Sequence, residues 1–417
     1  MKNYKISVET RNSISIKIVY FSMKMLYYGY EGCDFVRINW IEFKNLTTHQ
    51  EIQHIEFANL NLLVGVSGAG KTQILKTISK FVDFALRIKP IINFEADFSM
   101  GFTASNVVDD NSITSEKNDS QDYTWKIKFR KDKKVDANFS NIAIIEEYLD
   151  IGTKNIFKRN QKELTIDGYD AIPQIDGAQS VISIFRNNHV FNNILANFTF
   201  LSSYYQQQIA LNPLPVKIYE NMDTDFLEET SNIMLSLITS QIPIAAKLLF
   251  AKKFNIQEYH NIIEKFTAVF PSVIDLKVDL SPARNHYEFY IRTEQSGWIR
   301  QQDISGGMLK ALFILATIEF SISQNSVILI DEFENGLGAN CIDGITDYLN
   351  DVSTDVQLII TSHHPYIINH IQPDCWKLIS QKNGIISNRD AKTAGIGISK
   401  QDAFYQLLNL WEFENEI

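Results

Sequence analysis

Residues 60–72 read LNLLVGVSGAGKT, and this stretch decides the fold. Its first five residues form an apolar run typical of a buried strand, and a glycine-rich loop follows. Residues 73–88, QILKTISKFVDFALRI, then repeat apolar side chains with the period of a helix. The succession of strand, loop and helix predicts the first unit of an α/β sheet.

The loop from Gly65 to Thr72 fits the pattern GxxxxGK[ST] at every fixed position. Glycines let backbone N–H groups surround phosphates at the start of a helix, where the helix dipole favours anions. We expect Lys71 to reach the β- and γ-phosphates of ATP and the Thr72 hydroxyl to ligate Mg²⁺. A chance glycine-rich turn is the alternative, and the flanking strand and helix argue against it. The candidate nucleotide contacts are Gly65, Ser67, Gly68, Ala69, Gly70, Lys71, Thr72 and Gln73.

A second apolar strand, SVILIDE at 326–332, ends in two acids. Strands of this kind deliver their last residues to the carboxyl edge of the sheet, where ligands bind in open α/β folds. Asp331 is expected to hold Mg²⁺ through its water shell, and Glu332 to polarise the attacking water. An apolar strand ending in two acids is common by itself, so the prediction depends on its pairing with the Lys71 loop.

Two further motifs lie on either side of Asp331: ISGGM at 304–308 and TSHHP at 361–365. In this ordered set the sequence resembles the ATP-binding-cassette (ABC) superfamily, because ISGGM is similar to its LSGGQ signature and His363 stands where its switch histidine belongs. The resemblance implies a head-to-tail dimer with two shared ATP sites, and His363 as γ-phosphate sensor, with His364 as the alternative. The signature residues expected to cap the partner's γ-phosphate are Ser305, Gly306 and Gly307.

Two other elements of the superfamily are less well matched. Residues 335–338, NGLG, resemble the D-loop, but Gly338 stands where the family more often has Asp or His, which leaves signalling between the sites in doubt. Gln174 and Gln179 are both candidates for the Q-loop glutamine, and no flanking pattern chooses between them.

The expected fold is α/β: a P-loop NTPase with a doubly wound, mostly parallel sheet, an N-terminal antiparallel β subdomain and an inserted helical lobe. The expected parts are residues 1–103, carrying the loop; 104–270, a polar loop, a hairpin at 123–139 and mostly helical sequence from 140; and 271–417, carrying the remaining motifs. Residues 399–417 read as a terminal helix.

Local strings, including DEFENGLGANCID and SHHPYIIN, resemble the prokaryotic AAA-15/AAA-21 group, relatives of the RecF, SMC and OLD-family heads. The resemblance implies an ATPase subunit of an anti-phage system of Septu or PARIS type, acting with a separately encoded nuclease or Toprim-type effector. The 54 residues after His363 are too few for a Toprim domain of this chain's own. A DNA-repair ATPase of SMC or RecF type is the alternative, and a transport ATPase is the third hypothesis.

The net charge of −10 excludes a general polyanion binder, so nucleic acid would need a local basic patch. One face of the hairpin, with Lys126, Lys128 and Arg130, could contact phosphates, although a lysine-guarded sheet edge is the commoner arrangement. Three cysteines without a CxxC pair, no signal-peptide pattern and no apolar run of about 18 residues favour a cytoplasmic protein that does not enter a membrane.

Overall fold

The structure is a computed structural model that describes residues 36–87, 92–105, 120–132, 142–169, 175, 177–199, 201–203, 214–215, 244–322, 326–396 and 405–407. The chain divides into two compact units, which are described separately. Unit 1 comprises residues 1–32 and 206–320, and unit 2 comprises residues 33–205 and 321–417. This division does not cut the chain at 103 or 270, the boundaries expected from the sequence, and the strand ending at residue 105 pairs with the one beginning at residue 120.

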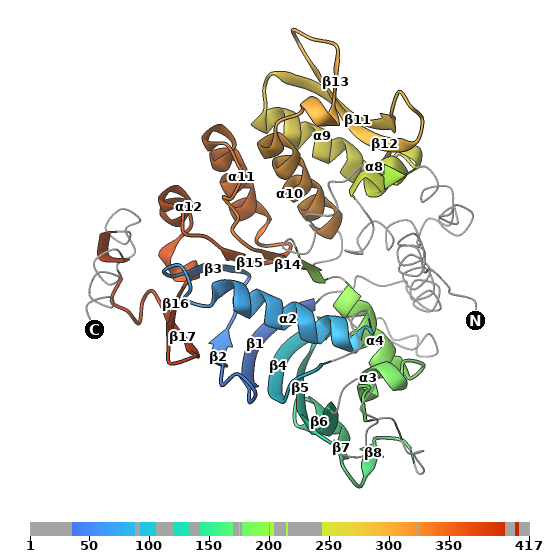
Figure 1. The fold of residues 1–417 in the computed structure, drawn as a ribbon, viewed down its shortest axis with the longest axis vertical. Helices are drawn as coiled ribbons and strands as arrows, with labels where there is room; N and C mark the ends of the chain where they lie inside the picture. Colours follow the sequence, from blue (N-terminus) through green and yellow to red (C-terminus); the bar gives the residue numbers. More distant parts are fainter. Residues whose placement is uncertain are drawn as a thin grey trace, which may run out of the picture. The chain divides into compact units, whose positions relative to one another are not determined.

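Unit 2 is built on one 13-stranded sheet (Figure 1). Its strands are β1 (Val36–Asn45), β2 (Glu51–Glu56), β3 (Leu60–Val64), β4 (Ala96–Ser105), β5 (Ser120–Lys131), β6 (Ile142–Ile151), β7 (Lys154–Asn160), β8 (Leu164–Ile166), β9 (Leu201–Ser203), β14 (Val327–Ile330), β15 (Gln357–Thr361), β16 (Trp376–Lys382) and β17 (Ile385–Asp390). Their order is β8-β7-β6-β5-β4-β1-β2-β17-β16-β3-β15-β14-β9.

The parallel part of this sheet contains β16, β3, β15, β14 and β9. Strands β3, β14 and β15 are buried at every residue, as expected for parallel strands covered on both faces. The helices that follow these strands are α2 (Lys71–Ala85), α11 (Ala339–Val352) and α12 (Pro365–His370). The α/β class expected from the sequence is confirmed, and three of these parallel strands, β3, β14 and β15, precede its motifs. The sheet as a whole is mixed and not mostly parallel, because the strands from β1 to β8 other than β3 extend it mainly by antiparallel pairing.

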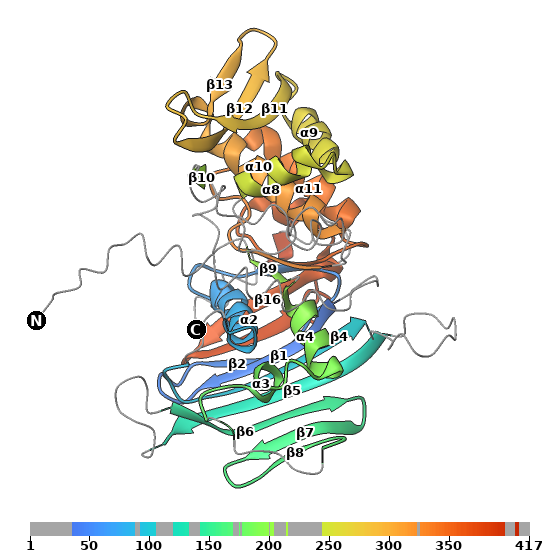
Figure 2. The ribbon, with the colours of Figure 1, turned by 90° about the vertical axis from the view of Figure 1, so that its right-hand side faces the viewer.

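The antiparallel part, from β2 and β1 through β4 to β8, is continuous with the parallel part. One face packs against α2 and α4 (His189–Thr199), with α3 (Val181–Ile184) beside them (Figure 2). Phe81 of α2 stacks on Phe98 of β4 at 3.9 Å between ring centroids, and Phe198 of α4 lies 5.1 Å from Phe102. Aromatic pairs add about 0.5–1.5 kcal/mol each beyond the burial of their area, and this packing holds α2, and with it the glycine-rich loop, on the sheet.

The stretch from residue 140 was expected to be mostly helical, and this is wrong for residues 142–166, which form β6, β7 and β8. In the second half of β6, the buried residues Glu147 and Leu149 alternate with the half-buried Glu146, Tyr148 and Asp150, and this period of two is a strand pattern. The first strand of the expected hairpin is present as β5, and its Trp125 and Ile127 are fully buried on one face. The polar segment at 106–119 and most of the terminal helix at 399–417 lie outside the described residues.

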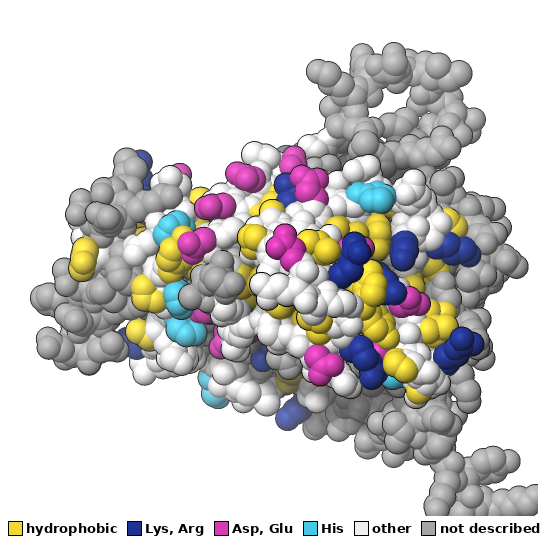
Figure 3. Space-filling view, turned by 90° about the horizontal axis from the view of Figure 1, so that it is seen from above, with side chains coloured by type: hydrophobic (Ala, Val, Ile, Leu, Met, Phe, Trp, Pro, Cys, Tyr) yellow, Lys and Arg dark blue, Asp and Glu magenta, His cyan; other side chains and the backbone are white. Residues whose placement is uncertain are grey.

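Unit 1 combines helices with a small antiparallel sheet, so its described part is not purely helical. Its elements are β10 (Leu214–Pro215), α8 (Ile244–Lys253), α9 (Gln257–Val269), β11 (Val273–Leu280), β12 (His286–Thr293), β13 (Trp298–Arg300), the 3₁₀ turn η2 (Gln301–Asp303) and α10 (Gly306–Ile322). The strands β11 and β12 follow Pro271 and pair antiparallel. Trp298 is exposed, with Lys277 4.6 Å above its ring, and apolar and charged side chains are interspersed on the face in Figure 3.

Across the described residues, none of the helices is both long enough and apolar enough to span a membrane.

Lys247 of α8 is buried, and burial lowers its pKa to about 7. Since the ordinary lysine pKa is about 10.4, the unfolded chain binds more protons than the folded chain between these values. Stability should therefore rise with pH from about 7 to about 10, by at most about 1.4 kcal/mol per pH unit. We expect Lys247→Met to raise the free energy of unfolding at pH 7 and to flatten this rise, measured by denaturant unfolding at several pH values.

Lys252→Met is the control, because Lys252 is exposed on the same helix. It should leave the rise with pH unchanged. A Lys247→Met protein with the wild-type pH profile would show that Lys247 remains charged in the folded chain.

Candidate functional site

Three neighbouring parallel strands end at one edge of the unit 2 sheet, and each end carries a sequence motif. Strand β15 pairs with β14 on one side and with β3 on the other. The glycine-rich loop follows β3, Asp331 and Glu332 follow β14, and Ser362 and His363 follow β15. The structure thus brings together the motifs expected at this edge, in the place where ligands bind in α/β sheets.

Two glycines of the loop between β3 and α2 lie against neighbouring strands that leave little room for a side chain. A Cβ on Gly65 would lie 2.3 Å from the carbonyl oxygen of Ile379 in β16. Gly70 caps α2 with φ of 96°, and a Cβ there would lie 2.4 Å from Cδ1 of Ile386 in β17. The loop therefore lies close against β16 and β17. At the N-terminus of α2 it presents backbone groups, with no side chain on the glycines.

Lys71 is the first residue of α2, and its side chain folds back over the loop. Its Nζ donates hydrogen bonds to the carbonyl oxygens of Gly65 at 2.7 Å and Val66 at 3.1 Å. Burial lowers the pKa of Lys71, and the negative charges of Glu334, Asp331 and Glu332 oppose this shift, Glu334 most strongly. The Lys71 ammonium therefore lies against the carbonyls of the loop, and the negative charges of three carboxylates favour its charged form.

Asp331 accepts two hydroxyl hydrogen bonds on the same oxygen. Thr72 donates to Oδ1 at 2.9 Å from α2, and Thr361 donates at 2.7 Å from the end of β15. The Thr361 oxygen in turn accepts from the backbone N–H of Glu332 at 2.7 Å. This chain of hydrogen bonds fixes the ends of β14 and β15 and the start of α2 relative to one another.

Glu332 adopts a backbone conformation that is rare for a residue with a side chain. Its φ is 46°, in the left-handed region, and its side chain is exposed. Asn335 donates to its Oε2 at 3.0 Å. Strained residues of this type cluster at functional sites, where the surrounding structure holds them in place.

The two histidines after β15 have different surroundings. His363 is 65% exposed in its side chain, and its Nδ1 lies 2.9 Å from Oε1 of the buried Glu334. His364 caps α12, since its Nδ1 accepts from the backbone N–H of Tyr366 at 3.3 Å. The ring of His364 is therefore occupied in capping, and His363 is the histidine whose ring reaches the site's surface.

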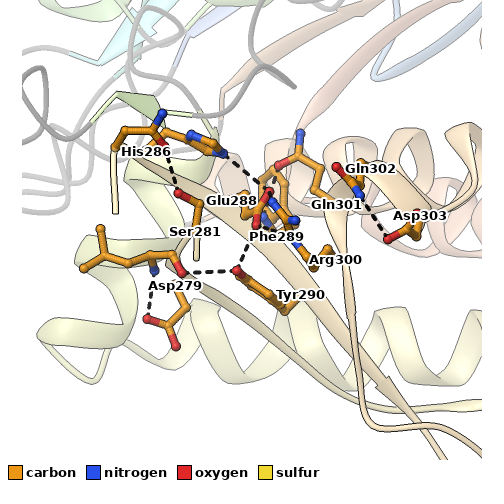
Figure 4. Close-up of polar contacts among 12 residues, drawn as sticks. Asp279, Ser281, His286, Glu288, Phe289, Tyr290, Arg300, Gln301, Gln302 and Asp303 are labelled. Carbon is orange, nitrogen blue, oxygen red and sulfur yellow. Dashed lines mark hydrogen bonds and ion pairs between the residues drawn. The ribbon is translucent and has the colours of Figure 1, made fainter. Parts of the chain in front are cut away.

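The signature Ile304–Met308 belongs to unit 1, and its last three residues begin α10. Ser305 accepts from the backbone N–H of Met308 at 3.2 Å, so it caps this helix, and Gly306 and Gly307 form its first turn. The preceding segment is tied to β12, because Arg300 donates to Glu288 at 2.8 Å and Gln301 accepts from the backbone of Phe289 at 3.1 Å (Figure 4).

The other candidates have structural partners. Gln73 lies 3.5 Å from Thr77 within α2, and Gln179 accepts from Arg87 at the end of that helix, whereas Gln174 lies outside the described residues. Gly338 caps α11, and its D-loop role stays a prediction. The remaining loop residues, Ser67, Gly68 and Ala69, lie between β3 and α2.

The candidate phosphate contacts on β5 are countered by acids. Lys128 pairs with Glu146 at 2.8 Å, Arg130 pairs with Asp97 at 2.7 Å, and Lys126 lies 5.7 Å from the Tyr148 ring. Strand β5 has neighbours on both sides, so the alternative of a lysine-guarded edge is wrong. These contacts do not favour nucleic-acid binding here.

Two residues of the site had no role assigned from sequence. Thr361 lies in the TSHHP motif, and its hydroxyl bridges Asp331 and Glu332. Glu334 is the last acid of DEFE, and the signal that could have revealed it is its spacing of three residues from Asp331. Only the tertiary structure brings it to His363.

The residues at this edge fit Mg·ATP. Lys71 is already held within the loop, and Thr72 and Asp331 lie 2.9 Å apart as a hydroxyl and a carboxylate. Mg²⁺ in nucleotide sites takes one or two such protein ligands, with the remaining positions filled by water and phosphate oxygens. Among the described residues there is no cluster of three or more metal-binding side chains, so these two and the nucleotide would share the ion.

Residues 60–369 match the protein family described as "AAA domain, putative AbiEii toxin, Type IV TA system". The match covers most of the chain, so the protein belongs to this family. With the loop and strand ends described above, it is a P-loop NTPase of the AAA-21 type, as the sequence resemblance implied. The search of curated proteins gave no match.

Solved structures with a similar course of the chain include SMC head domains. One, a head bound to the C-terminal winged-helix domain of ScpA, has a TM-score of 0.49 at 13% identity, covering 84% of this chain and 96% of that one. A Pyrococcus furiosus head gives 0.45 at 13%, covering 90% and 100%, and a Thermotoga maritima head gives 0.41 at 12%, covering 85% and 98%. At such scores nothing about activity or partners follows for this chain.

Proposed function

We propose that this protein is an ATPase that binds Mg·ATP on the Gly65–Thr72 loop and hydrolyses it to control an effector protein or DNA. The observation that carries the proposal is the hydrogen-bonded cluster of Thr72, Asp331 and Thr361 beside Lys71. It combines a cation, a carboxylate and a hydroxyl at a helix N-terminus, which is the set that nucleotide phosphates and Mg²⁺ require.

Each side chain has a distinct part in this proposal. Lys71 leaves the loop carbonyls and binds the β- and γ-phosphates, and the loop amides surround them. Thr72 and Asp331 hold the metal, which neutralises charge on the phosphates when bound. Glu332 orients and polarises the attacking water, and His363 donates to the γ-phosphate.

The direct test is phosphate release from ATP by the purified protein with and without Mg²⁺. We expect turnover that needs Mg²⁺ and stops when the ion is chelated. A protein that binds no ATP at millimolar concentration would contradict the proposal.

We further propose that two chains share each ATP site, as the resemblance of Ile304–Met308 to the ABC signature implies. The Ser305 hydroxyl and the start of α10 would then act on ATP held by the partner's Lys71. Ser305→Arg should bind ATP and fail to hydrolyse it. Mixed with Lys71→Ala, it should recover activity, because each mixed dimer regains one intact site.

The measurement is ATPase activity of each variant alone and of the mixture, with subunit exchange verified by two affinity tags. Ser296→Arg, which places the same charge on an exposed loop of unit 1, should keep wild-type activity. Verified mixed dimers that remain inactive, or a monomer with full turnover, would rule out the head-to-tail arrangement.

In the cell, we propose a role as the ATPase subunit of an anti-phage system with a separately encoded effector, such as a nuclease or a Toprim-type protein. The matched family's description, which names a toxin of toxin–antitoxin systems, supports a defence role. The test is phage plating on cells carrying the gene with its neighbours, compared with the same cells carrying Lys71→Ala. Equal plating, together with binding of DNA ends by the protein alone, would favour the repair ATPase.

A further inference from the structure

Glu334 is a buried carboxylate at the edge of the site, and one of its oxygens has a specific task. The residue is 7% exposed, although it follows the exposed Glu332 by only two positions. Its Oε1 accepts from the backbone N–H of His363 at 2.9 Å and lies 2.9 Å from Nδ1 of the same residue. One oxygen therefore holds both the backbone and the ring of His363.

The second oxygen of Glu334 is also buried, and it has no hydrogen-bond partner among the described residues. An ionised carboxylate is costly to bury unless nearby positive charge compensates it. Two compensating groups are on hand: Lys71, on which the Glu334 charge acts, and the His363 ring. A buried charge kept between these two groups needs a functional explanation, because an apolar side chain would stabilise the fold at lower cost.

The chemistry of imidazole supplies a functional explanation for the buried carboxylate of Glu334. A neutral ring that donates from Nδ1 has only a lone pair at Nε2, and a lone pair repels a phosphate oxygen. Only the protonated ring donates from both nitrogens, and a carboxylate at Nδ1 stabilises that form. Histidines that ligate metals commonly depend on such a carboxylate partner, which fixes the orientation of the ring.

We propose that Glu334 is the positioning residue of His363: its Oε1 holds the backbone N–H and the ring Nδ1, so that Nε2 is directed at the γ-phosphate. This inference rests on the proposed ATPase function. It assigns to Glu334 a task separate from that of Glu332, whose carboxylate is exposed and bonded to Asn335. Glu334 acts through His363 and does not itself touch the nucleotide.

The experiment is a double-mutant cycle with Glu334→Gln, His363→Ala and the double variant. Each protein is assayed for kcat and KM of Mg·ATP hydrolysis, for ATP affinity and for thermal unfolding. Glu334→Gln keeps the shape of the side chain and removes its charge. Glu163→Gln, at an exposed turn of unit 2, is the matched control and should behave as wild type.

We expect Glu334→Gln and His363→Ala each to lower kcat about 10- to 100-fold, with KM changed by less than about threefold. The double variant should be no slower than His363→Ala, because a residue that acts only through His363 has no effect once that ring is absent. A structural role for Glu334 would instead lower the unfolding temperature and add its effect to that of His363→Ala.

The outcomes separate this inference from the proposed function. Wild-type kcat in Glu334→Gln, or a further loss when it is added to His363→Ala, overturns the positioning role while ATP hydrolysis stands. A His363→Ala enzyme as fast as wild type also overturns it, because the ring is then not needed. If the wild-type protein hydrolyses no ATP, the proposed function fails and the role of Glu334 fails with it.

Discussion

Lys71→Ala should abolish ATP binding at concentrations that saturate the wild-type protein, and hydrolysis should be lost with it. The ammonium now lies inside the loop on the carbonyls of Gly65 and Val66, where phosphate would replace these two acceptors. Loss of a hydrogen bond to a charged group costs about 1.5–3 kcal/mol, which is roughly a 10- to 100-fold loss of affinity. Because Lys71 is partly buried, the lost charge–charge attraction to phosphate is larger than it would be at a fully exposed position.

The measurement is ATP affinity by calorimetry, together with phosphate release. Lys76→Ala is the matched control: it removes the same charge from the same helix, α2, at an exposed position. It should keep both affinity and turnover. Wild-type affinity in Lys71→Ala would refute the assignment of the site.

Glu332→Gln should still bind Mg·ATP and hydrolyse it very slowly, with the nucleotide-bound dimer accumulating. Removal of a positioned general base lowers rates by about 10²- to 10⁴-fold. The backbone should hold its shape, because the hydrogen bond from the Glu332 backbone N–H to the Thr361 hydroxyl does not involve the carboxylate. Single-turnover hydrolysis and size-exclusion chromatography with ATP would measure the two effects.

Asp331→Asn is the informative comparison, because it keeps the shape of the cluster and removes the charge beside the metal. It should weaken Mg²⁺ and thereby raise the metal concentration needed for turnover, which Glu332→Gln should not do. Turnover of Glu332→Gln within about threefold of wild type would mean that another group activates the water.

Much of the site could be predicted from sequence because its parts are local. A glycine-rich loop between an apolar strand and a helix has one main use, and every residue needed to identify it is contiguous. The same holds for the strand that ends in Asp331 and Glu332 and for the strand that ends before His363. Apolar runs of that length specify buried parallel strands, whose ends meet at one edge.

The extent of the sheet was decided by long-range pairing. The local sequence of residues 142–166 does not clearly separate a strand of the main sheet from a helix of an insertion. The hydrogen bonds between β5 and β6 decide it. The basic face of β5 likewise resembles a phosphate-binding surface until Glu146 and Asp97 are placed beside it.

The sequence by itself determined the class of the protein and predicts which residues bind the nucleotide, because those motifs are short and contiguous. Only the tertiary structure decided how they are held. Thr361 bridges two acids 29 and 30 residues away, and Glu334 reaches the ring of His363 from the next strand end. Such contacts depend on the order of strands in the sheet, and strand order is fixed by packing over the whole domain, which no local pattern encodes.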